Sequence, residues 1–315
     1  MPYSLLLQSE ASRQCAGMAE VRSCPACGNS DFTDLFSATD YLVSRETFFV
    51  RKCTVCGLTF TADPPDEKDI GRYYLSGDYI SHSDKKRNLT EHLYHIARRF
   101  MLSGKQRLVE RTTEKRGGTI LDIGSGTGYF VSFMQAKGWK VTGLELNKEA
   151  REYSIQKFGI NALAPSDVNL ITDGWADCVT FWHVLEHLSD PGGWMKEVKR
   201  ILKDNGKCII AVPNIKSADA LFFGKEWAAL DVPRHLWHFS PDTLLPFIKN
   251  EGFTCEEIRP MPLDVFYISI LSYRNTGKSM ALMRGLLTGF YLTAGRILQR
   301  NRASSLIYVI SKQSA

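Results

Sequence analysis

The chain has 315 residues, of which 44% are hydrophobic and 23% charged, with a formal net charge of +5. This composition is typical of a globular protein of more than one domain with enough apolar side chains for a sizeable core. The small positive charge does not require a nucleic-acid partner. No uninterrupted apolar run is long enough for a transmembrane helix, so a membrane-spanning protein is not expected.

The N-terminal segment shows no pattern of a folded element. Met1–Leu7 lacks a basic stretch followed by a long apolar one, so a secretion signal is not expected. Residues 1–20 are polar and without periodicity, and we predict a disordered leader there. An alternative is that Met18 is the true start.

Two tight cysteine pairs follow this leader. They read Cys24-Pro-Ala-Cys27 and Cys53-Thr-Val-Cys56, and a glycine comes after each. Four thiolates at this spacing suit a tetrahedral structural Zn²⁺, so we predict a zinc-ribbon-like module over 21–65. Because the protein fills all four positions, its role is structural or in recognition. The other cysteines are scattered singly, which favours a reducing, cytoplasmic compartment over a disulfide framework.

Strand-like and helix-like segments alternate in the rest of the chain. A helical linker or cofactor-lid region is expected over 66–116, and its aromatic segment Tyr73–Tyr79 either closes over a cofactor or packs between the modules. The alternation beyond it implies parallel strands joined by right-handed crossovers, and therefore an α/β fold over 117–315. Strands are predicted at 119–123, 140–144, 177–182, 208–212, 253–259 and 304–311, and helices at 88–115, 129–137, 148–158 and 194–203.

A glycine-rich loop joins the first of these strands to its helix. It reads Asp122-Ile-Gly124-Ser-Gly126-Thr-Gly128, and Glu145 ends the next strand. Glycines there allow a sharp turn and a close approach of ligand to backbone, and a carboxylate at Glu145 can bind both ribose hydroxyls. A dinucleotide site would use a longer glycine spacing. Carboxylates at Asp122 and Glu145 suit a ligand that carries a sulfonium and an ammonium group and no phosphate.

This segment resembles the first motif of class I S-adenosylmethionine-dependent methyltransferases. The resemblance covers about residue 107 to the C-terminus. It implies a Rossmann-like sheet that is parallel except for one antiparallel strand near the C-terminus. It also implies that S-adenosylmethionine is the cofactor and that its site is lined by Asp122, Gly124, Gly126, Gly128, Tyr129, Glu145, Leu146 and His183.

A histidine segment, His183-Val-Leu-Glu186-His187, follows the strand at 177–182. It is similar to the segment after the fourth strand in ubiquinone-biosynthesis-type methyltransferases and their uncharacterised relatives, where that strand end borders the transferred methyl group. The resemblance makes His187 the first candidate for a catalytic residue, because a neutral imidazole there can take a proton from an acceptor hydroxyl.

Other interpretations of the histidine segment stay open. The pattern H-x-x-E-H also occurs in zinc peptidases, although such a site needs a helical scaffold and a third ligand. Some ubiquinone-type enzymes hold a divalent ion near this segment. Alternatively, Glu186 and His187 only cap or position the local helix.

A second cluster lies at 230–239, where Asp231, Arg234, His235 and His238 stand close together. It resembles a recurring segment of the same relatives, and His235 and His238 are further catalytic candidates. The structural alternative is a turn whose histidines are satisfied by backbone groups.

An apolar, helical insert is predicted at about 263–298. Its apolar positions from Leu282 onward fall on one helical stripe, beside Arg284 and Arg296. The stripe serves either core or homodimer packing, or it forms a lid over an apolar or lipid-linked substrate. In the second case the lid would touch the membrane surface.

The sequence therefore predicts a methyltransferase that acts on an oxygen or carbon of a small molecule. Sugar-nucleotide, lipid-linked and quinone-like acceptors remain open. One alternative is an RNA methyltransferase with the zinc module gripping RNA, although no Asn/Asp-Pro-Pro-aromatic run follows the fourth strand and no long basic tract occurs. Another is a binding module that has lost catalysis.

Overall fold

A seven-stranded sheet forms the centre of the protein. The computed structural model describes residues 21–66, 68–74, 89–261, 263–295 and 300–313. Strand order in the sheet is β10-β11-β8-β7-β4-β5-β6, and β11 alone runs antiparallel to its neighbours. This confirms the predicted Rossmann-like sheet with one antiparallel strand near the C-terminus. The strands are β4 Thr119–Ile123, β5 Lys140–Leu144, β6 Asn161–Leu163, β7 Ala176–Trp182, β8 Leu202–Pro213, β10 Phe253–Pro260 and β11 Ser305–Lys312.

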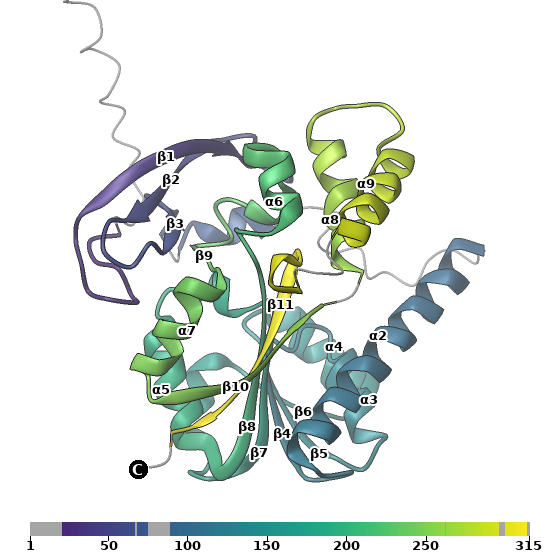
Figure 1. Cartoon of the computed structure of the whole chain (residues 1–315). Helices are drawn as coiled ribbons and strands as arrows, with labels where there is room; N and C mark the ends of the chain where they lie inside the picture. The colour runs from purple at the N-terminus through teal and green to yellow at the C-terminus, as the bar shows by residue number, and fades with distance from the viewer. Residues whose placement is uncertain (1–20, 67, 75–88, 262, 296–299, 314–315) are drawn as a thin grey trace, which may run out of the picture.

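Helices cover both faces of this sheet. Figure 1 shows α2, α3 and α4 on one face and α5 and α7 on the other, as expected for right-handed crossovers. These helices are α2 Leu89–Thr113, α3 Tyr129–Gln135, α4 Lys148–Phe158, α5 Pro191–Ile201 and α7 Pro241–Asn250. Short 3-10 helices are found at Ile70–Tyr74, Pro165–Leu170, Leu185–His187, Gly224–Glu226, Ala228–Leu230 and Arg300–Arg302.

The helix predicted at 194–203 begins earlier and ends earlier, at Pro191 and Ile201. The Asp190 side chain caps it by accepting a hydrogen bond from the Gly193 amide at 2.8 Å, and Pro191 suits the first helical position. Helix α7 was not predicted, because Pro246 interrupts its helical pattern.

A second, smaller sheet stands beside the large one. Its strand order is β1-β2-β3-β9, formed by Phe32–Thr39, Thr47–Cys53, Thr59–Thr61 and Trp237–His238. The first three strands lie within the module predicted at 21–65, whereas β9 comes from the segment after β8. The Phe60 ring packs between Phe32 and Trp237, at 4.8 Å and 6.2 Å between ring centroids. The N-terminal module therefore completes its sheet with the C-terminal half of the chain.

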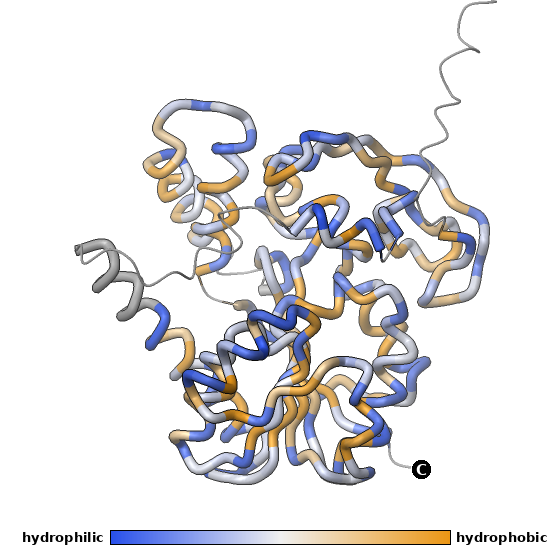
Figure 2. The backbone as a smooth tube through the Cα atoms, turned by 180° about the vertical axis from the view of Figure 1, so that it is seen from behind, coloured by the Kyte–Doolittle hydropathy of each residue, from blue (hydrophilic) through white to orange (hydrophobic). Residues whose placement is uncertain are grey.

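The predicted insert forms a helical hairpin, α8 Asp264–Asn275 and α9 Ala281–Gly295, next to the short α6 Ala218–Phe223. Figure 1 shows the hairpin and the small sheet at the same end of the large sheet. In Figure 2, seen from behind, they again stand apart from each other at that end. Within the part of the chain that the structure describes, no helix is long and apolar enough to cross a membrane. Residues 1–20 and 75–88, which include the predicted leader and most of the aromatic segment, lie outside the described residues.

Candidate active site

The glycine loop between β4 and α3 has a backbone that favours glycine. The φ angles of Gly124, Gly126 and Gly128 are +73°, +54° and +80°. A Cβ on Gly124 would lie 2.4 Å from the Val184 side chain, so the loop packs directly on the histidine segment. A Cβ on Gly126 would meet no atom within 4 Å. Gly126 therefore offers open backbone that a ligand can approach closely.

Glu145 holds its carboxylate against this loop from the end of β5. One carboxylate oxygen accepts a hydrogen bond from the Gly126 amide at 2.7 Å, and the other from the Asn147 amide at 2.8 Å. Each oxygen keeps a second lone pair, so the carboxylate can still accept bonds from two neighbouring hydroxyls. Leu146, the next residue in the chain, is 78% exposed.

Asp122 is buried at the end of β4. Thr180 donates a hydrogen bond of 2.6 Å to its carboxyl group, and burial raises the pKa of Asp122 to about 7. The ammonium of Lys105, from α2, lies 4.2 Å from the centre of the Trp182 ring and interacts electrostatically with Asp122. Burial lowers the pKa of Lys105 to about 8. Sequence reasoning missed Lys105, because a single lysine in a helix has no distinguishing spacing.

Tyr129 begins α3, and its ring faces α4. Its hydroxyl lies 3.4 Å from the Tyr153 hydroxyl and accepts a hydrogen bond from Lys157 at 3.2 Å. The Arg98 guanidinium stacks 4.1 Å from the ring centre. The predicted contact of Tyr129 with a cofactor stays a prediction.

His183 lies between two carboxylates. Its Nδ1 is 3.4 Å from Glu186 and its Nε2 is 3.3 Å from Asp264, the first residue of α8. Although burial disfavours the charged imidazole, these two carboxylates raise the pKa of His183 to about 10. The resulting imidazolium ties the helical hairpin to the end of β7.

Glu186, His187 and His235 form a cluster in which their potential ligand atoms lie within 4.8 Å of one another. The rings of the two histidines meet edge to face at 4.5 Å between centroids. Glu186 is 1% exposed, and its carboxylate oxygens have no hydrogen-bond partner among the described residues apart from the longer ionic contact with His183. An unsatisfied buried carboxylate is costly unless a charged or polar group meets it.

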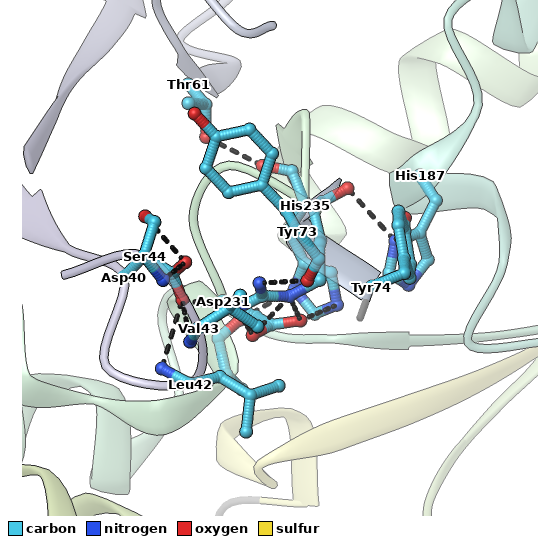
Figure 3. Close-up of polar contacts among 12 residues, drawn as sticks. Asp40, Leu42, Val43, Ser44, Thr61, Tyr73, Tyr74, His187, Asp231 and His235 are labelled. Carbon is cyan, nitrogen blue, oxygen red and sulfur yellow. Dashed lines mark hydrogen bonds and ion pairs between the residues drawn. The ribbon is translucent and has the colours of Figure 1, made fainter. Parts of the chain in front are cut away.

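Backbone carbonyls orient both imidazoles of this cluster. His187 Nδ1 lies 3.0 Å from the Arg234 carbonyl oxygen, and His235 Nδ1 lies 2.9 Å from the Ala229 carbonyl oxygen. A donated Nδ1–H leaves Nε2 of each ring with its lone pair. Burial, with His235 nearby, lowers the pKa of His187 to about 4, so that ring is neutral at neutral pH. Figure 3 shows His187 beside Tyr74, whose hydroxyl lies 3.2 Å from its Nδ1.

His238 lies in β9, outside this cluster. Its Nε2 lies 3.2 Å from the Thr61 hydroxyl, which itself donates to the His235 carbonyl oxygen at 2.6 Å. Burial lowers the pKa of His238 to about 3. Of the three predicted catalytic histidines, the structure brings His187 and His235 together and leaves His238 bonded to the small sheet.

Comparison with known proteins identifies the family. A family model described as a methyltransferase domain matches residues 93–258. The chain belongs to this family of methyltransferase domains. This confirms the predicted class I S-adenosylmethionine-dependent methyltransferase.

Similar proteins include two named ubiquinone biosynthesis O-methyltransferases. The one from Xanthomonas oryzae pv. oryzae (strain PXO99A) is 28% identical over 158 residues, which are 46% of this chain and 66% of that protein. The one from Glaesserella parasuis is 26% identical over 166 residues, or 47% and 70% of the two chains. The match to the first therefore spans just under two thirds of its length. A solved S-adenosylmethionine-dependent methyltransferase from Archaeoglobus fulgidus is 18% identical and covers 67% of this chain and 94% of its own, with a TM-score of 0.46.

The four paired cysteines come together in front of the methyltransferase domain. All four Sγ atoms lie within 4.8 Å of one another, with Cys24 3.4 Å from Cys56 and Cys27 3.5 Å from Cys53. These distances are far longer than a disulfide bond of about 2.05 Å. Four thiols at the corners of one small space match the ligand set of a structural zinc site.

A buried arginine joins the cysteine module to the methyltransferase domain. The Arg234 guanidinium bonds to Asp40 at 2.8 Å, to Asp231 at 2.6 Å and to the Tyr73 carbonyl oxygen at 2.8 Å. Figure 3 shows Asp40, Asp231 and His235 in one group of polar contacts. Asp40 was not a sequence candidate, because a lone aspartate in a hairpin turn carries no motif.

Proposed function

We propose that the protein transfers the methyl group of S-adenosylmethionine to an oxygen or carbon of a small-molecule acceptor. The observation that carries the proposal is the Glu145 carboxylate, which is fixed against the open backbone of Gly126. This arrangement offers acceptor oxygens for ribose hydroxyls beside a loop where a ligand can approach. The family match and the parallel sheet support the same cofactor.

The charged groups at the end of β4 complete the proposed cofactor site. We infer that Asp122 faces the cationic part of the cofactor and that the Lys105 ammonium binds its carboxylate. Asp122 is buried, Lys105 is partly buried, and the two groups lie close enough to interact electrostatically. A charged hydrogen bond in such a site contributes more than one exposed to water.

Isothermal titration with S-adenosylmethionine tests the cofactor site. We expect Glu145→Ala to weaken binding by about 10–100-fold, because the loss removes hydrogen bonds to a charged group. Glu149→Ala is the matched control, since Glu149 is an exposed carboxylate in the first turn of α4. Equal affinity of the Glu145 variant and the wild type would contradict the proposal.

We propose His187 as the group that takes a proton from the acceptor, with His235 beside it. His187 is neutral, fixed by the Arg234 carbonyl group, and part of a segment that packs on the glycine loop through Val184. A neutral imidazole can accept a proton while the methyl group is transferred. Release of S-adenosylhomocysteine, measured with quinol, sugar-nucleotide and lipid-linked acceptors, should fall strongly in His187→Ala. No turnover with any acceptor by a protein that binds the cofactor would favour the silent binding module.

The same cluster also suits a divalent ion. Glu186 would supply a carboxylate oxygen, and His187 and His235 would each supply Nε2, an oxygen and nitrogen donor set common for divalent transition metals. A bound ion would lower the pKa of an acceptor hydroxyl. Metal analysis decides between the two interpretations: an ion beyond the cysteine site, lost in Glu186→Gln, supports the metal site. Only the cysteine-bound metal in both proteins would leave the histidines to act alone.

We further propose that Cys24, Cys27, Cys53 and Cys56 hold one structural Zn²⁺. Their thiols converge, and the module around them contacts the methyltransferase domain through β9 and Arg234. Because the module contacts the rest of the chain in this way, we favour a structural role over RNA binding. Elemental analysis should find one zinc per chain, and Cys27→Ser should lower that content. The cytoplasmic location expected from the cysteine pattern stays a prediction.

A further inference from the structure

Three small residues of helix α9 face the rest of the protein. Gly285 and Gly289 face α8, where a Cβ on Gly285 would lie 2.5 Å from Ile270 and one on Gly289 would lie 2.4 Å from Phe266. Thr288, between them, is buried and hydrogen-bonds the Tyr273 hydroxyl at 3.0 Å. These small residues let the two helices approach closely.

Most large apolar side chains of α9 consequently point outward, whereas Leu292 is buried. We name six of them the α9 outer face: Leu282, Met283, Leu286, Leu287, Phe290 and Tyr291, all of them exposed. They come as adjacent pairs that repeat every four residues and therefore form one stripe along the helix. An ordinary surface helix has the reverse arrangement, with its apolar stripe toward the core. Contiguous exposed apolar surface of this kind marks a site of interaction.

The charged residues of the hairpin after its first residue, Asp264, all have one sign. No aspartate or glutamate occurs in residues 265–315, whereas this stretch contains several arginines and lysines. Arg274 and Lys278 are exposed near the connection between α8 and α9, and Arg284 lies on α9 itself. An apolar stripe on a hairpin whose other charged residues are cations complements a bilayer with anionic headgroups.

A second copy of this chain complements the α9 outer face less well. A two-fold symmetric contact places the same patch of both chains together. Arg274, Lys278 and Arg284 would then face their own copies, and this stretch has no carboxylate to pair with them. The charge pattern thus favours lipid over self-association.

We propose that the α9 outer face docks on an anionic membrane surface, with the helix lying in the plane of the interface. The hairpin that carries this face begins at Asp264, whose carboxylate lies 3.3 Å from His183 at the end of β7. Docking therefore brings the lipid surface to the part of the methyltransferase domain that holds the histidine segment. A membrane-embedded, amphiphilic molecule would meet the protein there.

Co-sedimentation of the full chain with vesicles tests the proposal. We expect binding to vesicles that contain phosphatidylglycerol and much weaker binding to phosphatidylcholine alone. The variant Leu287→Ser/Phe290→Ser should lower the partition coefficient by on the order of 100-fold, because each large apolar side chain contributes about tenfold or more. Arg274→Glu/Lys278→Glu should reduce binding to the anionic vesicles by more than tenfold. Leu170→Ser is the matched control, since Leu170 is also 70% exposed but lies outside the hairpin.

Three results would overturn the proposal. The first is no preference for anionic vesicles, or equal binding by the wild type and the Leu287/Phe290 variant. The second is a wild-type dimer in sedimentation velocity that this variant converts to a monomer, which would assign the face to a second copy. The third is vesicle binding by a chain that starts at Met18 but not by the full chain, which would assign the face to residues 1–17. The assay needs no methyl acceptor, so its failure leaves the proposed function standing.

Discussion

Replacement of Arg234 by methionine tests whether the cysteine module and the methyltransferase domain are held together by a buried charge. Arg234 and Asp40 are each 1% exposed, and their side chains belong to different parts of the chain. Methionine keeps most of the aliphatic volume of arginine but removes its charge and its hydrogen bonds. The carboxylates of Asp40 and Asp231 would then lose their common partner.

The contacts of the two aspartates set the expected loss of stability. Removal of one partner from a buried ion pair costs about 3–5 kcal/mol. Asp40 would still accept hydrogen bonds from the amides of Leu42 and Ser44, at 3.0 Å and 2.8 Å, and the Asp231 side chain is 22% exposed. Because both carboxylates keep some stabilisation, we expect Arg234→Met to lower the free energy of unfolding by about 3 kcal/mol, at the lower end of that range.

Urea unfolding of the protein, followed by tryptophan fluorescence, measures this change. Arg51→Met is the matched control, because the pair of Arg51 with Asp34 is exposed and should cost under about 1 kcal/mol. A loss no larger than in Arg51→Met would refute the argument that this ion pair joins the two modules.

Three further predictions concern other groups. Asp177 is buried, and its hydrogen bonds from Lys115, Lys203 and Thr119 outweigh the effect of burial and lower its pKa. Its contribution to stability should therefore be complete above the unfolded pKa near 4 and be lost as the pH falls below it, so the free energies of unfolding of wild type and Asp177→Asn should converge in acid. The pKa of Lys105 is about 8, so affinity for S-adenosylmethionine, measured by titration calorimetry, should fall above that pH in the wild type. Lys105→Met should bind about tenfold more weakly and lose this pH dependence. Removal of metal with a strong chelator should lower the melting temperature of the wild type, whereas a metal-free protein that melts unchanged would contradict a structural zinc.

The central sheet could be predicted because its signals are local. Alternation of apolar strands with helical segments from residue 117 onward is enough to indicate parallel strands with crossovers. Glycines at 124, 126 and 128 indicate a turn that needs positive φ, and the two Cys-x-x-Cys pairs indicate a metal site by their spacing alone. In each case, residues a few positions apart carry the information. The short strand Asn161–Leu163 and the helix containing Pro246 were missed because their local patterns are weak.

The site depended on contacts that no local pattern encodes. His187 and His235 were separate candidates, and only the fold shows that their rings meet at 4.5 Å while His238 bonds to Thr61. The helical hairpin illustrates the same limit, since only the structure shows that the small residues Gly285 and Gly289 face α8 while the apolar stripe is exposed.

The sequence by itself determined the α/β class, the glycine loop and the two cysteine pairs, because short stretches of backbone and neighbouring side chains specify them. Only the tertiary structure decided which distant groups meet. Asp40 and Arg234 are 194 positions apart, and strand β9 leaves the methyltransferase domain to complete the small sheet. Such pairings arise because burial of apolar surface brings remote segments together. A charge that is buried in this way is stable only where a group of opposite charge or a hydrogen-bond partner lies next to it.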